Sequence, residues 1–188
     1  MAAPAVAQTQ PASFAYVSNR LSNYVTVVNT ATNKVTDTID LDASGGAGAR
    51  GVAASMDAIY VTTGGPTPSS DDVSVIDPST NTVTATIPVG TGARGVAADP
   101  VDGGNAFVAS EGSNTVSVID PATNVATVPV GKAPGEVAFS PDGTRVYVTN
   151  QQDGTATVMD PSTNTRIGTL DVGSHPWGIA IKPSTLDS

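Results

Sequence analysis

Four short segments recur in a fixed order along this chain of 188 residues, and the whole set occurs four times. The repeat is clearest at an aromatic position, which returns at spacings of 44, 47 and 40 residues. The four aromatic residues are Tyr16, Tyr60, Phe107 and Tyr147. One such unit cannot bury its own hydrophobic faces, so tandem copies at this period indicate units that stack on their neighbours.

Each unit has the pattern of four β-strands. In the second copy the strands are expected near residues 59–63, 73–77, 83–89 and 95–98. These runs are short, rich in β-branched residues and bounded by turn residues. We therefore predict an all-β fold, a β-propeller of four four-stranded antiparallel blades. The last strand of each unit consists of small residues, which places it next to the central axis.

The second and third strands are joined by Asp-Pro-x-Thr-Asn at residues 77–81, 120–124 and 160–164. Asp accepts backbone N–H groups at the start of a turn, Pro presets φ, and Asn tolerates the left-handed conformation. The motif therefore predicts a tight hairpin. The first copy has Asn29-Thr30 in place of Asp-Pro, and we expect its turn to form without the proline.

Residues 146–150 (Val-Tyr-Val-Thr-Asn), followed by the motifs at 158–164 and 172–180, resemble the YVTN β-propeller repeat family in sequence and order. The resemblance covers residues 14–183. It implies a propeller of the extracytoplasmic or surface-layer type found in bacteria and archaea. The expected repeats are about 14–57, 58–104, 105–144 and 145–183. Residues 184–188 are expected to form a C-terminal tail, and residues 1–13 a flexible tail or the remnant of a signal peptide.

The two ends of the repeat region are complementary. Residues 14–19 lack an inner strand, and residues 178–182 form an inner strand without outer partners. We predict that the last strand completes the first blade and closes the ring within one chain. The alternatives are half of an eight-bladed ring made by two chains, or a fragment of a longer propeller. The expected state is a monomer or a homodimer.

Composition excludes several classes of partner. The net charge is −9, from 17 acidic and 8 basic residues, and no Lys/Arg run occurs, so we expect no nucleic-acid partner. No apolar stretch is long enough to cross a bilayer. The chain has no cysteine, which rules out thiolate metal sites and a cysteine nucleophile.

The variable loops at one end of the blades, including the longer loops at residues 42–49 and 63–72, are the expected binding surface. Binding residues concentrate on loops held by a rigid scaffold. The candidate residues ring the mouth of the central channel: Arg50, Arg94, Glu136, His175 and Trp177. The arginines are suited to clamp a carboxylate or phosphate, and Trp177 to stack on a sugar or aromatic ring. The alternative is that the arginines pair with neighbouring acids and Trp177 plugs the channel.

No metal cluster, cofactor motif or activated nucleophile is present in the sequence, so we assign no catalytic residues, no metal and no cofactor. We expect a non-catalytic binding or protein-interaction module, secreted, at the cell surface or in a periplasm. Its partner is a small molecule, a glycan or a protein. The alternatives are a hydrolase or lyase that uses Glu136 and His175 at the channel mouth, and a structural surface-layer component.

Overall fold

The structure is a computed structural model that describes residues 13–41, 48–64, 71–101 and 104–183. These residues form fifteen β-strands and no helix, so the described ranges contain no helical segment that could cross a membrane. The expected tails at 1–13 and 184–188 lie outside the described residues, apart from Ser13. Most of the two longer loops, at 42–47 and 65–70, also lies outside them.

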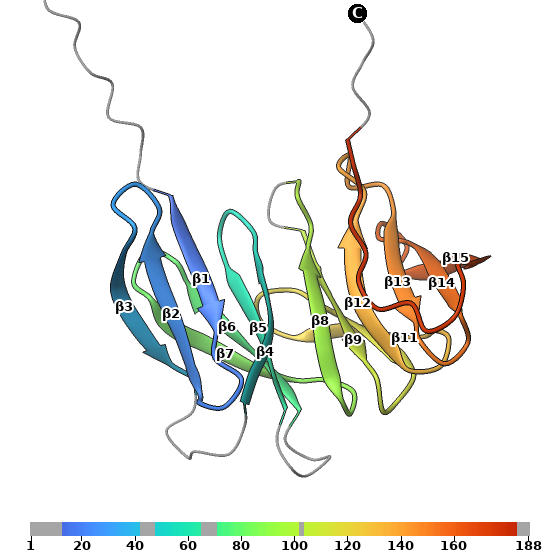
Figure 1. The fold of residues 1–188 in the computed structure, drawn as a ribbon, viewed down its shortest axis with the longest axis horizontal. Helices are drawn as coiled ribbons and strands as arrows, with labels where there is room; N and C mark the ends of the chain where they lie inside the picture. The colour runs from blue at the N-terminus through green and yellow to red at the C-terminus, as the bar shows by residue number, and fades with distance from the viewer. Residues whose placement is uncertain (1–12, 42–47, 65–70, 102–103, 184–188) are drawn as a thin grey trace, which may run out of the picture.

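The strands form four antiparallel sheets arranged as the blades of a β-propeller, which confirms the predicted fold class (Figure 1). The first blade contains β1 (Phe14–Ser18), β2 (Tyr24–Asn29) and β3 (Lys34–Asp40). The second contains β4 (Gly48–Ala54), β5 (Ile59–Gly64), β6 (Asp72–Asp77) and β7 (Thr82–Pro88). The third contains β8 (Ala93–Ala98), β9 (Ala106–Ser110), β10 (Thr115–Ile119) and β11 (Asn124–Pro129). The fourth contains β12 (Pro134–Phe139), β13 (Val146–Asn150), β14 (Thr155–Asp160) and β15 (Thr165–Asp171).

The hairpins between the second and third strands form as their motif predicts. The Asp77 carboxylate accepts the N–H of Ser79 at 2.7 Å, and Asn81 adopts a left-handed φ of 54°. In the first blade the Asn29 side chain takes the part of the aspartate and accepts the N–H groups of Ala31 and Thr32. An amide oxygen therefore replaces the carboxylate without loss of the turn.

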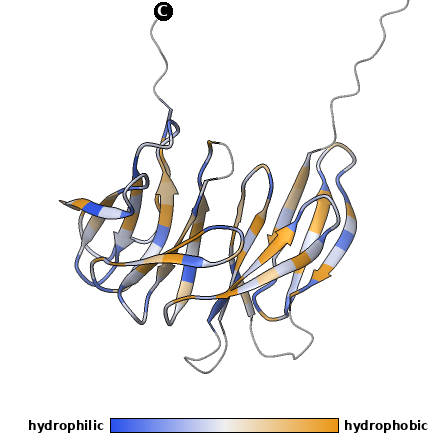
Figure 2. Cartoon of the chain, turned by 180° about the vertical axis from the view of Figure 1, so that it is seen from behind, coloured by the Kyte–Doolittle hydropathy of each residue, from blue (hydrophilic) through white to orange (hydrophobic). Residues whose placement is uncertain are grey.

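Three hydrophobic clusters bury the faces between successive blades. They consist mainly of valine, isoleucine and alanine, with Phe107 and Phe139 in edge-to-face contact at 5.4 Å. Hydrophobic residues concentrate on the strands and hydrophilic residues at the hairpins (Figure 2). The predicted position of the small-residue strand is confirmed, because β4, β8 and β12 are edge strands of their sheets and β8 contacts both β4 and β12.

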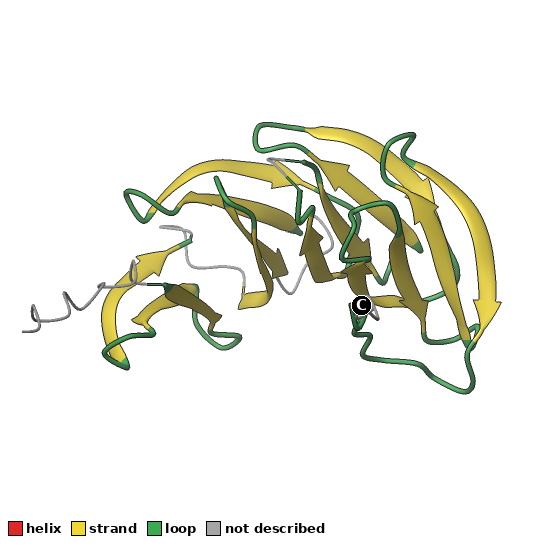
Figure 3. Cartoon of the chain, turned by 90° about the horizontal axis from the view of Figure 1, so that it is seen from above, coloured by secondary structure: helices red, strands yellow, loops and turns green. Residues whose placement is uncertain are grey.

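The blades form an open arc, with the first and last blades at its two ends (Figure 3). The predicted closure through the termini is therefore not found. The first sheet has the order β1-β2-β3, and no described strand pairs with the inner edge of β1. The C-terminal segment stays with the last blade instead, because the Thr149 hydroxyl donates to the Trp177 carbonyl at 3.0 Å.

Candidate functional site

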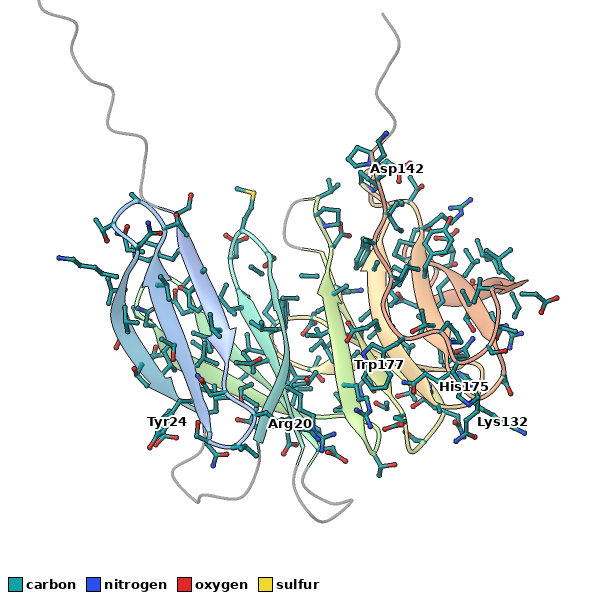
Figure 4. The ribbon with its side chains drawn as sticks, viewed as in Figure 1. Arg20, Tyr24, Lys132, Asp142, His175 and Trp177 are labelled. Atoms are coloured by element: carbon teal, nitrogen blue, oxygen red, sulfur yellow. The ribbon has the colours of Figure 1, made fainter. Side chains whose placement is uncertain are left out.

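A cavity of about 310 Å³ opens on the concave side of the arc, at the end of the blades where the variable loops lie. Its polar and aromatic lining comes from Ser18, Arg20, Arg50, Arg94, Glu136 and Trp177. Arg20 lies on the side of the first blade and Trp177 on the side of the last (Figure 4). Four of the five predicted site residues thus line one cavity.

Each complete inner strand presents its site residue at a break in the strand ladder. The register of pairing shifts between Ala49 and Val52, and the same shift occurs in the two following blades. The residues in these bulges are Arg50-Gly51, Arg94-Gly95 and Gly135-Glu136. A bulge bends the strand and re-aims its side chains, so the local backbone directs Arg50, Arg94 and Glu136 to the cavity.

A hydroxyl group holds two of these bulges. Thr62 accepts the N–H of Gly51 at 2.8 Å and donates to the carbonyl of Arg94, in the next blade, at 2.6 Å. Thr149 likewise accepts the N–H of Glu136 at 3.0 Å. Both are the threonine of the repeated aromatic-Val-Thr segment. This threonine therefore fixes the backbone of the site.

Arg50 reaches across to the next blade, where its Nη1 donates to the carbonyl of Ala93 at 3.1 Å. Gly64 lies beside this side chain, and a Cβ atom there would lie 2.7 Å from Cζ of Arg50. Glycine at this position therefore leaves the space that the guanidinium occupies.

Arg94 makes two contacts with charged or aromatic side chains. Its Nε donates to Oε2 of Glu111 at 2.5 Å, and its Cζ lies 5.2 Å from the centroid of the Trp177 ring. The ion pair agrees with the alternative in which an arginine is paired with a neighbouring acid. Trp177, in contrast, is 54% exposed, so it does not fill the channel as a buried plug.

Glu136 is half-buried in the cavity wall. Burial raises the pKa of its carboxyl above the ordinary value of 4.5, and the charge of Arg94 partly offsets this effect. The chemistry of the cavity is thus set by three guanidinium groups, one carboxyl with a raised pKa and one exposed indole.

His175 is the predicted site residue that does not line this cavity. It adopts a positive φ of 50° and borders a separate hollow with Gln151, Asp153 and Asp171. Glu136 lines the channel-mouth cavity and His175 the other hollow, so the described residues do not bring together the pair that the alternative hydrolase or lyase would use.

Three site residues were not singled out in the sequence: Ser18, Arg20 and Glu111. The repeat contains the signal that would have found Arg20 and Glu111. Arg20, Gly64, Glu111 and Gln151 occupy the same position, two residues after the Ser/Thr/Ala of the first segment. In the complete blades this position faces the bulge residue of the same blade.

The hydroxyl of Ser18 donates to the carbonyl of Arg50 at 2.5 Å, and no described base accepts its proton. Within the described ranges, no three His, Asp or Glu side chains are grouped to hold a metal ion.

No protein-family model and no curated protein sequence matches the chain. Among solved structures it is similar to hydrazine synthase of Kuenenia stuttgartiensis, at 25% identity and a TM-score of 0.74, over 86% of this chain and 46% of that one. It is also similar to a functionally unknown protein from Desulfotomaculum acetoxidans DSM 771, at 18% identity and a TM-score of 0.72, over 86% and 53%. The chain spans about half the length of each, and the likeness supports the fold.

Proposed function

We propose that the chain is a non-catalytic extracytoplasmic binding module that takes an anionic ligand with a planar group at the channel mouth. The observation that carries the proposal is the clustering of arginine. The chain has a net charge of −9 and five arginines, and three of these, Arg20, Arg50 and Arg94, line one cavity. Such a cluster in an acidic protein provides a local site for negative charge.

Among the contacts of the described residues, Arg50 and Arg94 keep further donors for a ligand. A guanidinium has five N–H donors. Arg94 uses its Nε for Glu111, and Arg50 uses Nη1 for the Ala93 carbonyl. The remaining terminal N–H groups suit paired hydrogen bonds to a carboxylate or phosphate.

Trp177 supports the planar part of the proposal. Its indole is half-exposed at the cavity edge and stands beside Arg94. An aromatic face at a polar cavity offers stacking area to a sugar or an aromatic ring. A ligand such as an aromatic carboxylate or a sugar acid would use both groups.

The extracytoplasmic location is part of the proposal. It is supported by the resemblance to the YVTN repeat and by Ala5-Val6-Ala7, which fits the small-x-small pattern of a signal-peptide cleavage site. Fractionation of cells that express the full gene tests this part separately from ligand binding.

A panel of matched ligands tests the binding function. Benzoate against benzamide, and glucuronate against glucose, differ chiefly in the charged group. A ligand that binds only the folded chain raises its melting temperature, so the anions should stabilise the protein and the neutral partners should not. Arg50→Gln should abolish the shift, and Arg166→Gln, on the outer strand of the last blade, should keep it. Equal shifts with neutral ligands, or an unchanged shift in Arg50→Gln, would refute the proposal.

A further inference from the structure

We propose that two copies of this chain join head to tail into a closed ring of eight blades, in which residues 176–182 of each copy pair with β1 of the other. The proposal is independent of the ligand at the channel mouth. It rests on the two ends of the arc. Each end exposes hydrophobic side chains whose counterparts are buried between successive blades.

The last blade exposes one of its two faces. In the blades before it, the equivalent face packs against the next blade. Leu170 of β15 is 49% exposed, whereas Ile39 and Ile87 at the same position are 5% and 2% exposed. Ile39 and Ile87 belong to the clusters between the first, second and third blades. Val172 is likewise half-exposed, and its counterpart Leu41 is buried. The last blade therefore has the side chains for one more blade interface.

The first blade exposes the opposite face of the same interface. Val17 of β1 is 47% exposed, whereas its counterparts Val61, Val108 and Val148 have no exposed surface. Val61, for example, is covered by Val25 and Val27 of the preceding blade. No described blade precedes Val17, so the two ends of the arc match as the two sides of an internal interface do.

Among the described strands, β1 also has no partner on its inner edge, where its counterparts have one. In the complete blades, Val61 pairs with Val52, Val108 with Val96, and Val148 with Val137. Residues 178–181, Gly-Ile-Ala-Ile, repeat the Gly-Val-Ala-Ala of residues 51–54 and 95–98. By this register Ile179 is the partner of Val17. An unpaired edge strand is a template for a strand from another chain.

The end segment already lies where the inner strand of a following blade belongs. Ser18 donates to the carbonyl of Arg50, and Thr62 to that of Arg94, each from one blade to the inner strand of the next. Thr149 makes the same bond to the carbonyl of Trp177. The segment is thus placed as the first strand of a fifth blade, and the other three strands of that blade are those of β1–β3.

A second copy fits this arrangement better than closure within one chain. The two end faces lie at opposite ends of an arc that is far from closed (Figure 3). Two head-to-tail copies related by a twofold rotation satisfy both ends at once, and the ring closes.

The ring brings a further side chain to the channel mouth. In the second blade the bulge residue Arg50 lies beside Gly64, and in the third blade Arg94 pairs with Glu111. Gly64 and Glu111 occupy the same position of the repeat. In the first blade that position is Arg20, and the matching bulge residue is Trp177 of the second copy. The indole is then flanked by Arg94 of its own chain and Arg20 of the other.

Cysteine crosslinking tests the pairing, because the chain has no cysteine of its own. Val17→Cys and Ile179→Cys chains of different mass are mixed and oxidised. Directly opposed residues of antiparallel strands are close enough for a disulfide. We expect a crosslinked heterodimer from this mixture, and none when Ser162→Cys replaces Ile179→Cys. A chain that contains both Val17→Cys and Ile179→Cys and crosslinks as a monomer would show closure within one chain and overturn the proposal.

Mass measurement in solution provides the second test. Native mass spectrometry and light scattering should give twice the chain mass at micromolar concentration. Leu170→Lys should give a folded monomer, because Leu170 is half-exposed in the single chain. Met56→Lys, at an exposed hairpin away from both end faces, should remain a dimer. A monomeric parent protein, or an open series of larger assemblies, contradicts the two-copy ring.

Discussion

The guanidinium carbon of Arg94 lies 5.2 Å from the centroid of the Trp177 ring, although the two residues are far apart along the chain. Arg94 belongs to the third blade and Trp177 follows the fourth, so the contact spans the inner strand β12. It links the end segment to the arc, and it places a cation and an aromatic face together on the cavity wall.

Replacement of Trp177 separates a ligand anchor from a structural plug. The side chain is half-exposed, so Trp177→Ala should lower the free energy of unfolding by only about 0.5–1 kcal/mol, the value of an exposed cation–π contact. Affinity for an aromatic carboxylate should fall by about tenfold or more, as expected for an aromatic anchor. Chemical denaturation and calorimetric titration measure the two quantities. A stability loss of about 3 kcal/mol or more would identify a core residue instead.

Glu136 should make anion binding depend on pH. Burial raises the pKa of this carboxyl, so the group gains charge above pH 4.5 and then repels an anion. Benzenesulfonate, which does not titrate in this range, should bind a few-fold more weakly at neutral pH, in line with the roughly 0.2–1 kcal/mol of partly exposed charge pairs. Glu136→Gln should remove that part of the pH dependence. Identical pH profiles for the parent and the variant would show that Glu136 does not face the ligand.

The Glu136 carboxyl should also make the free energy of unfolding fall as the pH rises, whereas an acid in a salt bridge makes it rise. Its pKa is higher in the folded chain than in the unfolded chain, so the folded chain binds more protons between the two values. Protonation of Glu136 therefore stabilises the folded chain fully at a pH below the unfolded-state pKa. This stabilisation is lost as the pH rises through the folded-state pKa. Glu136→Gln should therefore be at least as stable as the parent at pH 7. Urea denaturation of both chains at pH 4 and pH 7 measures this difference.

The Thr62 hydroxyl should be required for the bulge that carries Arg50. Thr62→Val leaves the Gly51 N–H and the Arg94 carbonyl without their partner, which should cost about 1–3 kcal/mol. Thr62→Ser keeps the hydroxyl and should recover most of that loss. Denaturant midpoints measure both. A valine variant as stable as the serine variant would show that the hydroxyl has no role in holding the two strands.

Two glycines of the site should respond differently to alanine. A Cβ at Gly95 would lie 2.6 Å from the carbonyl oxygen of Gly135, which is backbone, so Gly95→Ala should be clearly destabilising. A Cβ at Gly64 meets mainly the end of the Arg50 side chain, so Gly64→Ala should keep the fold and weaken anion binding. Melting and ligand titration of both variants test the contrast. A Gly64→Ala chain that binds anions as the parent does would show that the position of Arg50 is unimportant.

Much of the fold was predictable because the repeat specifies it locally. Turn residues such as Asp77 and Asn81 determine their own hairpins, and β-branched residues determine the strands between them. Closure was not predictable in this way. It depends on the angle between successive blades, which arises from packing at positions such as Ile39 and Leu170 and has no local sequence signature.

The candidate site was predictable in part for a similar reason. Arg50, Arg94, Glu136 and Trp177 follow from alignment of the inner strands, because repeats place equivalent residues around one axis. His175 is two residues before Trp177 in the sequence, but it lines another hollow, and its φ of 50° has no signature in the repeat. Arg20 was missed because it follows β1 and does not belong to an inner strand, so alignment of the inner strands does not include it.

The fluorescence of Trp177 provides the most direct measurement of the central claim, since it is the only tryptophan of the chain and lines the proposed site. Titration with an aliphatic carboxylate or with phosphate, which do not absorb the emission, should change its intensity along a saturable curve. Arg50→Gln should remove the saturable change, and Arg166→Gln should retain it. A response that never saturates, or one that is the same in Arg50→Gln, would contradict an anion site at the channel mouth.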